Sequence, residues 1–255
     1  MAVARASLPD GPGSARELLA RRDVEAVEIG FPTLEELPYR DFVRALLGRQ
    51  GFKLEFHGQE PDSALALVAD RLFGPGAYVR ERDLLGEDIS ALKLFMSELA
   101  GGPPPLVAIR TYFAPGDLVW HLDRVGDPSA VRLVWPIGRP AGMRVTPADN
   151  IDEECYRAFM RREHALLGRL DTRVLRTGED VRSLWAHRPR QLKALISGQF
   201  PFLIDAERHW EVGPGAASIH RVQTPAQQGS YHRSSWENHA TPGLQIVITA
   251  VSEGA

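Results

Sequence analysis

A histidine and an aspartate stand two residues apart in VWHLDRV, at positions 119–125 of this 255-residue chain. Side chains alternate between the two faces of a β-strand, so His121 and Asp123 would share one face and could hold one metal ion. Two histidines and one carboxylate form the facial triad of non-haem Fe(II) oxygenases, which leaves coordination positions open for oxygen and an organic ligand. The spacing alone equally fits a polar strand face on which Asp123 pairs with Arg124. The metal interpretation therefore needs a third ligand and supporting context.

Two longer stretches provide that context. IRTYFAPGDLVWHLDRV, at 109–125, combines a tyrosine-bearing strand, a Pro-Gly turn and the His-x-Asp strand, and GPGAASIHRVQTP, at 213–225, joins a glycine turn to a histidine. In these features the chain resembles the Fe(II)/2-oxoglutarate-dependent oxygenase superfamily, over roughly 106–125 and 210–251. The resemblance implies a double-stranded β-helix, which is a jelly-roll barrel with the metal at its open end.

By this resemblance His121 and Asp123 are the proximal metal ligands and His220 is the distal ligand. Three other histidines compete for the third position: His209, His232 and His239. The first stands at an apparent strand start, and the other two lie in SYHRSSWENHATPG, which has the composition of a loop. Each of the three is better explained as a surface or hydrogen-bonding residue, so the sequence favours His220.

The resemblance also implies an arginine that binds the far carboxylate of 2-oxoglutarate, often with a hydroxyl residue two positions later. Arginine suits this role because its planar fork meets a carboxylate bidentately. The C-terminal strand LQIVITAVS contains no basic residue, so the nearest match is Arg233-x-Ser235, thirteen residues past His220. Arg110 and Arg132 are the next candidates. Without any such anchor the enzyme would use oxygen and substrate alone.

Two further features bear on the ligands. Tyr112 resembles the superfamily tyrosine that hydrogen-bonds the cosubstrate, and it has the same strand parity as Arg110; an ordinary core aromatic is an equal alternative. A charged, helix-prone stretch at about 150–198 falls between the halves of the barrel pattern and could form a lid. Its arginines are solvated by default, and any that point inward would favour an anionic or amino-acid-like substrate.

The elements that must position these residues change character near residue 106. Apolar residues at helical spacing predict helices at 14–22, 33–49, 61–73 and 89–102. Alternating or β-rich runs predict strands at 51–58, 106–113, 117–125, 130–138, 200–206, 208–222 and 244–252. We therefore expect an α+β protein with a helical N-terminal part and a β-rich core.

The chain has no convincing internal linker, so we expect a single domain, 1–255. Residues 1–14 are small and Pro/Gly-rich and are expected to be flexible. Residues 15–105 would form mainly helical support, and 106–255 would form the β-helix core with the helical insertion at about 150–198.

Composition excludes several classes of protein. The chain is 44% hydrophobic and 25% charged with a net charge of −3, which gives no overall attraction to nucleic acid. No apolar run approaches a membrane span, and the start lacks the apolar core of a secretory signal. The single cysteine, Cys155, excludes an intramolecular disulfide and an all-cysteine metal site. We expect a cytoplasmic protein without membrane or nucleic-acid partners.

The leading prediction is a mononuclear non-haem Fe(II) dioxygenase that uses 2-oxoglutarate and O2. Such an oxidoreductase would oxidise a C–H bond of a small molecule by hydroxylation, desaturation or cyclisation. The alternatives are an Fe(II)/O2 enzyme of the same fold without 2-oxoglutarate and a non-catalytic jelly-roll binding module. A zinc hydrolase is a third, since two histidines and an aspartate can also hold zinc with an open position.

Overall fold

The computed structural model describes residues 3–49, 52–58, 60–112, 118–126, 129–167, 183 and 189–252. The turn predicted between the first two barrel strands and the middle of the helix-prone stretch lie outside these ranges. Within them the protein is a mixed α+β structure built around one large sheet and one small sheet.

The large sheet has seven strands in the order β1-β2-β8-β5-β10-β4-β3. Their bounds are Val3–Ala6 for β1, Ala26–Ile29 for β2, Lys53–His57 for β3, Leu106–Tyr112 for β4, Ala130–Ile137 for β5, Ala217–Arg221 for β8 and Gly243–Val251 for β10. All neighbouring pairs are antiparallel except β1 and β2, which are parallel. The C-terminal strand β10 thus lies in the middle of the sheet, between β4 and β5.

The small sheet has three antiparallel strands in the order β7-β6-β9: Trp210–Glu211, Met143–Thr146 and Tyr231–Ser234. One isolated β-bridge joins His121 to His232 at the free side of β9, and another joins Arg124 to Gln223. The segment 117–125 was predicted as a strand; in its described part, 118–125, it makes only these two bridges.

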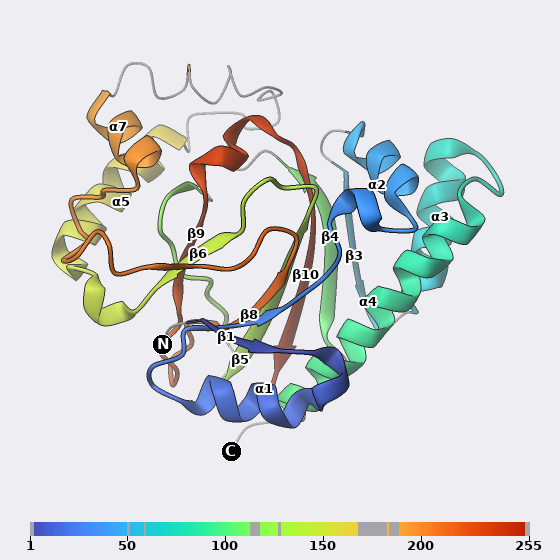
Figure 1. Ribbon diagram of the computed structural model, residues 1–255, viewed down its shortest axis with the longest axis horizontal. Coiled ribbons are helices and arrows are strands. Elements are labelled where there is room, and N and C mark those ends of the chain that lie inside the picture. The colour runs from blue at the N-terminus through green and yellow to red at the C-terminus, as the bar shows by residue number, and fades with distance from the viewer. Residues whose placement is uncertain are drawn as a thin grey trace.

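Helices cover one face of the large sheet. The α-helices with described bounds are α1 (Gly11–Ala20), α2 (Arg40–Leu47), α3 (Pro61–Phe73), α4 (Val79–Ala100), α5 (Glu153–Leu167) and α7 (Pro189–Ser197). Figure 1 shows α2, α3 and α4 on one side of the large sheet and β6 and β9 on the other, with α5 and α7 beyond the small sheet. None of the described helices is long and apolar enough to cross a membrane.

Strand alternation gives the large sheet two chemically different faces. Along β5, Leu133, Trp135 and Ile137 enter the main hydrophobic core with the helices, whereas the residues between them line a pocket. Along β10, Leu244 and Ile246 are in the same core and Gln245 faces the pocket. The sheet is therefore a wall between the helical core and the candidate site.

Several predicted elements differ from the observed ones. The helix predicted at 33–49 is divided into a short 3-10 helix, Leu34–Glu36, and α2, because Pro38 holds the preceding Leu37 in an extended conformation. The predicted strand at 200–206 makes a single bridge, at Leu203. Strand β1 lies within the segment expected to be flexible, where it pairs with β2.

The largest difference concerns residues 230–243, which are predicted from their composition to be a loop. They form β9 followed by a 3-10 helix, Trp236–Ala240. Strand β9 is buried on both sides, and its residues include a histidine and an arginine, so it lacks the apolar alternation by which strands are recognised. Strands β1, β2 and β6 were missed as well, each being four residues long.

Candidate metal centre

Three side chains with metal-ligating atoms converge between the two sheets. His121, Asp123 and His232 each offer one atom, and these atoms all lie within 4.8 Å of one another. The backbones of the two histidines are joined by hydrogen bonds, from His121 N to His232 O at 2.9 Å and from His232 N to His121 O at 3.0 Å. Because the two residues are direct partners in this antiparallel bridge, their imidazoles lie on the same side of the paired segments. Asp123 lies on that side too, as the two-residue spacing predicted.

The two histidines of this group are oriented in the same way. Nδ1 of His121 lies 2.9 Å from the carbonyl oxygen of Val119, and Nδ1 of His232 lies 3.1 Å from that of Ser230. A neutral imidazole that donates its Nδ1–H to a carbonyl keeps the lone pair of Nε2 free for a metal. The backbone two residues earlier thus sets the ring orientation in both cases.

Asp123 is held by two groups from the large sheet. Its Oδ2 lies 2.8 Å from a guanidinium nitrogen of Arg132 and 3.3 Å from Nε2 of His220. Burial raises the pKa of Asp123, but the hydrogen bond from His220 and the positive charge of Arg132 act against burial, and the net shift is downward. The pKa of Asp123 therefore lies well below its usual value, and the carboxylate is ionised.

Burial also favours the neutral form of two nearby imidazoles, those of His232 and His220. It lowers the pKa of His232 well below the usual value, and the neighbouring His121 and His220 lower it further. Burial likewise lowers the pKa of His220. Metal ions bind neutral imidazoles and ionised carboxylates, so the shifts at His232 and Asp123 suit a metal.

His220, which the sequence favoured as the third ligand, lies next to this group but not in it. It projects from β8, and its ring is fully buried with its centroid 4.4 Å from that of His232. His232, which the sequence set aside as a loop residue, completes the group of three. The other two candidate histidines contact nearby residues: Nδ1 of His209 contacts the carbonyl of Ala206, and the ring of His239 stacks on Trp236.

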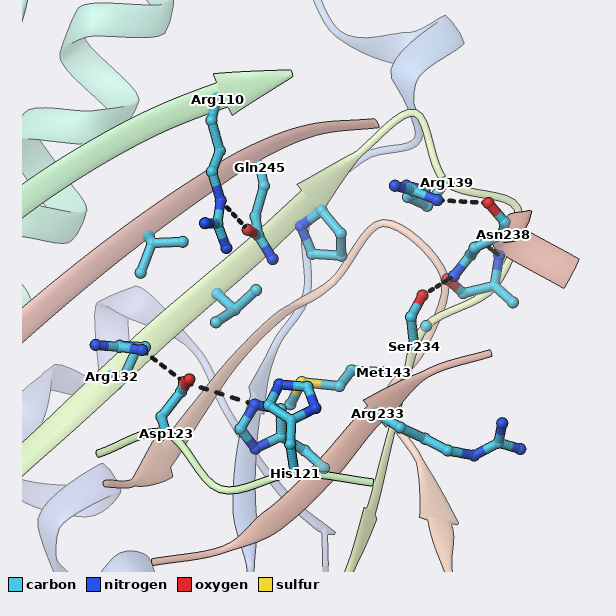
Figure 2. Close-up of a pocket in the computed structure, with 16 residues that line it drawn as sticks. Arg110, His121, Asp123, Arg132, Arg139, Met143, Arg233, Ser234, Asn238 and Gln245 are labelled. Atoms are coloured by element: carbon cyan, nitrogen blue, oxygen red, sulfur yellow. Dashed lines mark hydrogen bonds and ion pairs between the residues drawn. The ribbon is translucent and has the colours of Figure 1, made fainter. Parts of the chain in front are cut away.

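A pocket of about 600 Å³, part of it open to solvent, adjoins the three ligating groups. Its walls are β4, β5 and β10 of the large sheet and β6 and β9 of the small sheet (Figure 2). Four arginines border it: Arg110, Arg132, Arg139 and Arg233. Among the described lining residues Asp123 is the one acid, so the pocket is strongly cationic and suits an anionic ligand.

Arg110 faces the pocket, as its strand parity indicated. It pairs in register with Gln245 of β10, and its Nε donates to Oε1 of Gln245 at 2.7 Å. Figure 2 shows the two side chains directed toward each other on the large-sheet side of the pocket. Tyr112 lies at the end of the same strand, and its side chain is outside the described part of the structure.

Arg233 and Ser235, the cosubstrate residues favoured by the sequence, have different surroundings. Arg233 alternates with His232 along β9, and its guanidinium lies over the rings of Trp120 and Phe200, 5.5 and 5.4 Å from their centroids. Figure 2 shows this side chain directed away from Asp123. Burial lowers the pKa of Arg233 to about 10. Ser235 is fully buried.

Sequence reasoning did not single out Arg139 and Asn238. Arg139 NH1 donates to the backbone carbonyl of Asn238 at 2.5 Å. The Asn238 amide bonds the backbone of Ala141 in both directions, at 3.1 and 2.9 Å, and donates to Ser234 Oγ at 3.0 Å. These contacts tie the loop after β5 to the segment after β9. No sequence motif marks the contacts of Asn238 with Arg139 and Ala141, because these positions are about a hundred residues apart.

Solved structures that are similar to this chain include two dioxygenases for auxin oxidation. The dioxygenase for auxin oxidation 1 from Arabidopsis thaliana, in a binary complex with 2-oxoglutarate, is 11% identical; the match covers 100% of this chain and 93% of that one, with a TM-score of 0.49. The dioxygenase for auxin oxidation from rice is 12% identical over 96% of this chain and 82% of that one, with a TM-score of 0.47. No protein-family model and no curated protein matches the chain.

Proposed function

We propose that this protein is a mononuclear non-haem Fe(II) oxygenase that uses 2-oxoglutarate and O2 to oxidise a small molecule. The observation that carries the proposal is the convergence of His121, Asp123 and His232 beside a cationic pocket. Two sheets that enclose this pocket, antiparallel except for the β1–β2 pair, support a double-stranded β-helix as the architecture.

The donor set fits Fe(II). Two neutral imidazoles and one carboxylate can occupy one face of an octahedral ion and leave the other positions open. In this proposal His232 is the third ligand in place of His220, because one of its ring nitrogens belongs to the converging atoms. Its Nε2 lies 3.5 Å from Oδ2 of Asp123, and its Nδ1 is fixed by the Ser230 carbonyl. A zinc ion could occupy the same three ligands, so metal identity is part of the test below.

Arg110 and Gln245 are the proposed anchor for the far carboxylate of 2-oxoglutarate. In the β5–β10 register Gln245 pairs with Pro136, four residues along β5 from Arg132, which contacts the ligand Asp123. At ~3.3 Å per residue this is roughly 13 Å along the sheet, a gap that a metal on Asp123, a five-carbon dicarboxylate and the Arg110 side chain would together span. Arg233 and Ser235 are less suitable, since Arg233 is directed away from Asp123.

Iron with bound oxygen and 2-oxoglutarate would supply the oxidising chemistry for a C–H bond. The protein's own residues then have separate tasks. Arg110 and Gln245 orient the cosubstrate, and Val134, Val247 and Met143 give apolar surface that limits water near the metal. The excess of arginines over acids in the described lining favours a small anionic substrate.

Anaerobic titration with Fe(II) and 2-oxoglutarate tests the metal and the cosubstrate together. We expect a weak visible charge-transfer band in the wild-type protein and no band in His232→Ala. His57→Ala, which changes an exposed residue on β3, is the control and should keep the band.

Two other results would overturn parts of the proposal. Iron binding and oxygen consumption without the band would indicate an enzyme that works without 2-oxoglutarate. Bound zinc with no response to Fe(II) would indicate a hydrolase instead.

A further inference from the structure

His220 and Arg132 form a cross-strand pair behind Asp123. They are direct partners in the antiparallel register of β5 and β8, so their side chains leave the same face of the sheet side by side. Both reach the same oxygen of Asp123, Arg132 at 2.8 Å and His220 at 3.3 Å. The side chain of His220 is fully buried, and that of Arg132 is 21% exposed.

The surroundings of His220 fix where its proton lies. Nδ1 of His220 is buried and has no hydrogen-bond partner among the described residues, whereas Nε2 faces the Asp123 carboxylate. A proton on Nδ1 would leave a buried donor unpaired and would direct the lone pair of Nε2 at a carboxylate oxygen. The favourable tautomer therefore carries its proton on Nε2 and donates it to Asp123.

A ring that donates from Nε2 to Asp123, and whose Nδ1 is enclosed by protein, has no lone pair to offer a metal beside Asp123. The ring also packs against His232, with a 44° angle between the two planes. His220 therefore contacts two of the three proposed ligands, Asp123 and His232, but has no atom placed to bind the metal itself.

We propose that His220 is a positioning residue that, together with Arg132, clamps the Asp123 carboxylate in its metal-binding orientation and binds no metal itself. The proposal rests on the proposed metal site, and it assigns to His220 a role other than the ligand role that the sequence pattern implied. Partners of metal ligands in such positions typically change metal affinity 10–100-fold when they are removed.

Two substitutions separate hydrogen bonding from packing. His220→Leu fills a similar volume without a donor, and His220→Gln places an amide N–H close to the position of Nε2. Co(II), added anaerobically, serves as the probe, and both its dissociation constant and its ligand-field spectrum are measured, with the melting temperature recorded for every variant. We expect His220→Leu to weaken Co(II) binding about 10–100-fold and His220→Gln to recover most of the loss.

The outcomes are distinguishable. If both variants abolish Co(II) binding as His232→Ala does, His220 is a ligand and the proposal is wrong. If both bind Co(II) like wild type, the clamp has no effect on the metal and the proposal is also wrong. Should wild type bind no metal, the proposed function fails, and nitrogen-15 NMR of the imidazoles decides the remaining point: the His220–Asp123 bond requires the Nε2–H tautomer of His220, and the Nδ1–H tautomer overturns it.

Discussion

At the scale of single residues, the arginines that border the pocket differ in their contacts and therefore in the roles they can have. Arg132 is engaged by Asp123 and by the Thr249 hydroxyl, at 2.8 and 3.0 Å. Arg233 is packed among aromatic rings. Arg110, beside the neutral amide of Gln245, faces the pocket. Residue type alone does not separate these roles, because each arginine has the same charge and reach.

Arg110→Met should weaken 2-oxoglutarate binding while iron binding is kept. A hydrogen bond to a charged group contributes about 1.5–3 kcal/mol, which corresponds to a roughly 10–100-fold increase in the dissociation constant. Titration of 2-oxoglutarate into the anaerobic Fe(II) protein, followed by the charge-transfer band, measures the change.

Arg233→Met is the matched control for this prediction. Its removal should leave 2-oxoglutarate affinity unchanged, because the guanidinium lies over Trp120 and Phe200 rather than toward the metal. A methionine also avoids burying a charge, so the free energy of unfolding should stay within about 1 kcal/mol of wild type. The reverse pattern, with Arg233→Met losing cosubstrate affinity and Arg110→Met keeping it, would restore the assignment made from sequence.

At the scale of elements, the helical layer depends on close contact between α3 and α4. Gly86 lies in the middle of α4, and a Cβ added there would come 1.8 Å from Oδ1 and 3.2 Å from Cα of Asp62 on α3. The Asp62 carboxylate could rotate away, but its backbone could not without moving the helix. This contact favours glycine at position 86 although glycine weakens a helix.

Gly86→Ala should therefore lower the free energy of unfolding by about 1–3 kcal/mol through overpacking. Gly13→Ala is the contrasting substitution: Gly13 lies in α1 with nothing within 4 Å of the added Cβ, so the change should stabilise by about 0.5–1 kcal/mol. Urea denaturation of both variants measures the two effects. If Gly86→Ala and wild type had equal free energies of unfolding, α3 and α4 could move apart to admit the methyl group without loss of stability, which would contradict the prediction.

At the scale of the whole molecule, buried tyrosines connect distant parts of the chain. Tyr39 donates to Asp88 at 2.5 Å within the helical layer, and Tyr231 of β9 donates to Glu153 of α5, also at 2.5 Å. Burial first, and then these carboxylates, raise the pKa values of Tyr39 and Tyr231. Burial raises the pKa of Tyr156 to about 12.

These shifts predict a loss of stability in alkali. A phenol whose pKa is higher in the folded state than in the unfolded chain contributes stability that is complete below the unfolded value, about 10, and is lost as the pH rises above it. We expect unfolding to accompany ionisation of these tyrosines, so that phenolate absorbance and loss of circular dichroism rise together above about pH 10. Tyr39→Phe should reduce the pH dependence. Reversible ionisation of all five tyrosines near pH 10 in the folded protein would contradict this.

The sequence by itself determined the elements with strong local patterns and the relative directions of side chains that are close neighbours in the chain. It predicted the bounds of α3, nearly those of β4 and β5, and the shared side of His121 and Asp123, because helix and strand periods are local properties of the backbone. It also indicated that Arg110 faces inward, by the same alternation.

Only the tertiary structure decided which histidine joins this pair and where each arginine points. His220 has the sequence context of a ligand, but β8 lies in the large sheet, where its ring is enclosed behind Asp123. His232 lies in a short strand without apolar alternation, yet backbone pairing with His121 turns its ring toward the same point. Register between segments far apart in the chain sets these directions, and register depends on long-range hydrogen bonds that no local pattern specifies.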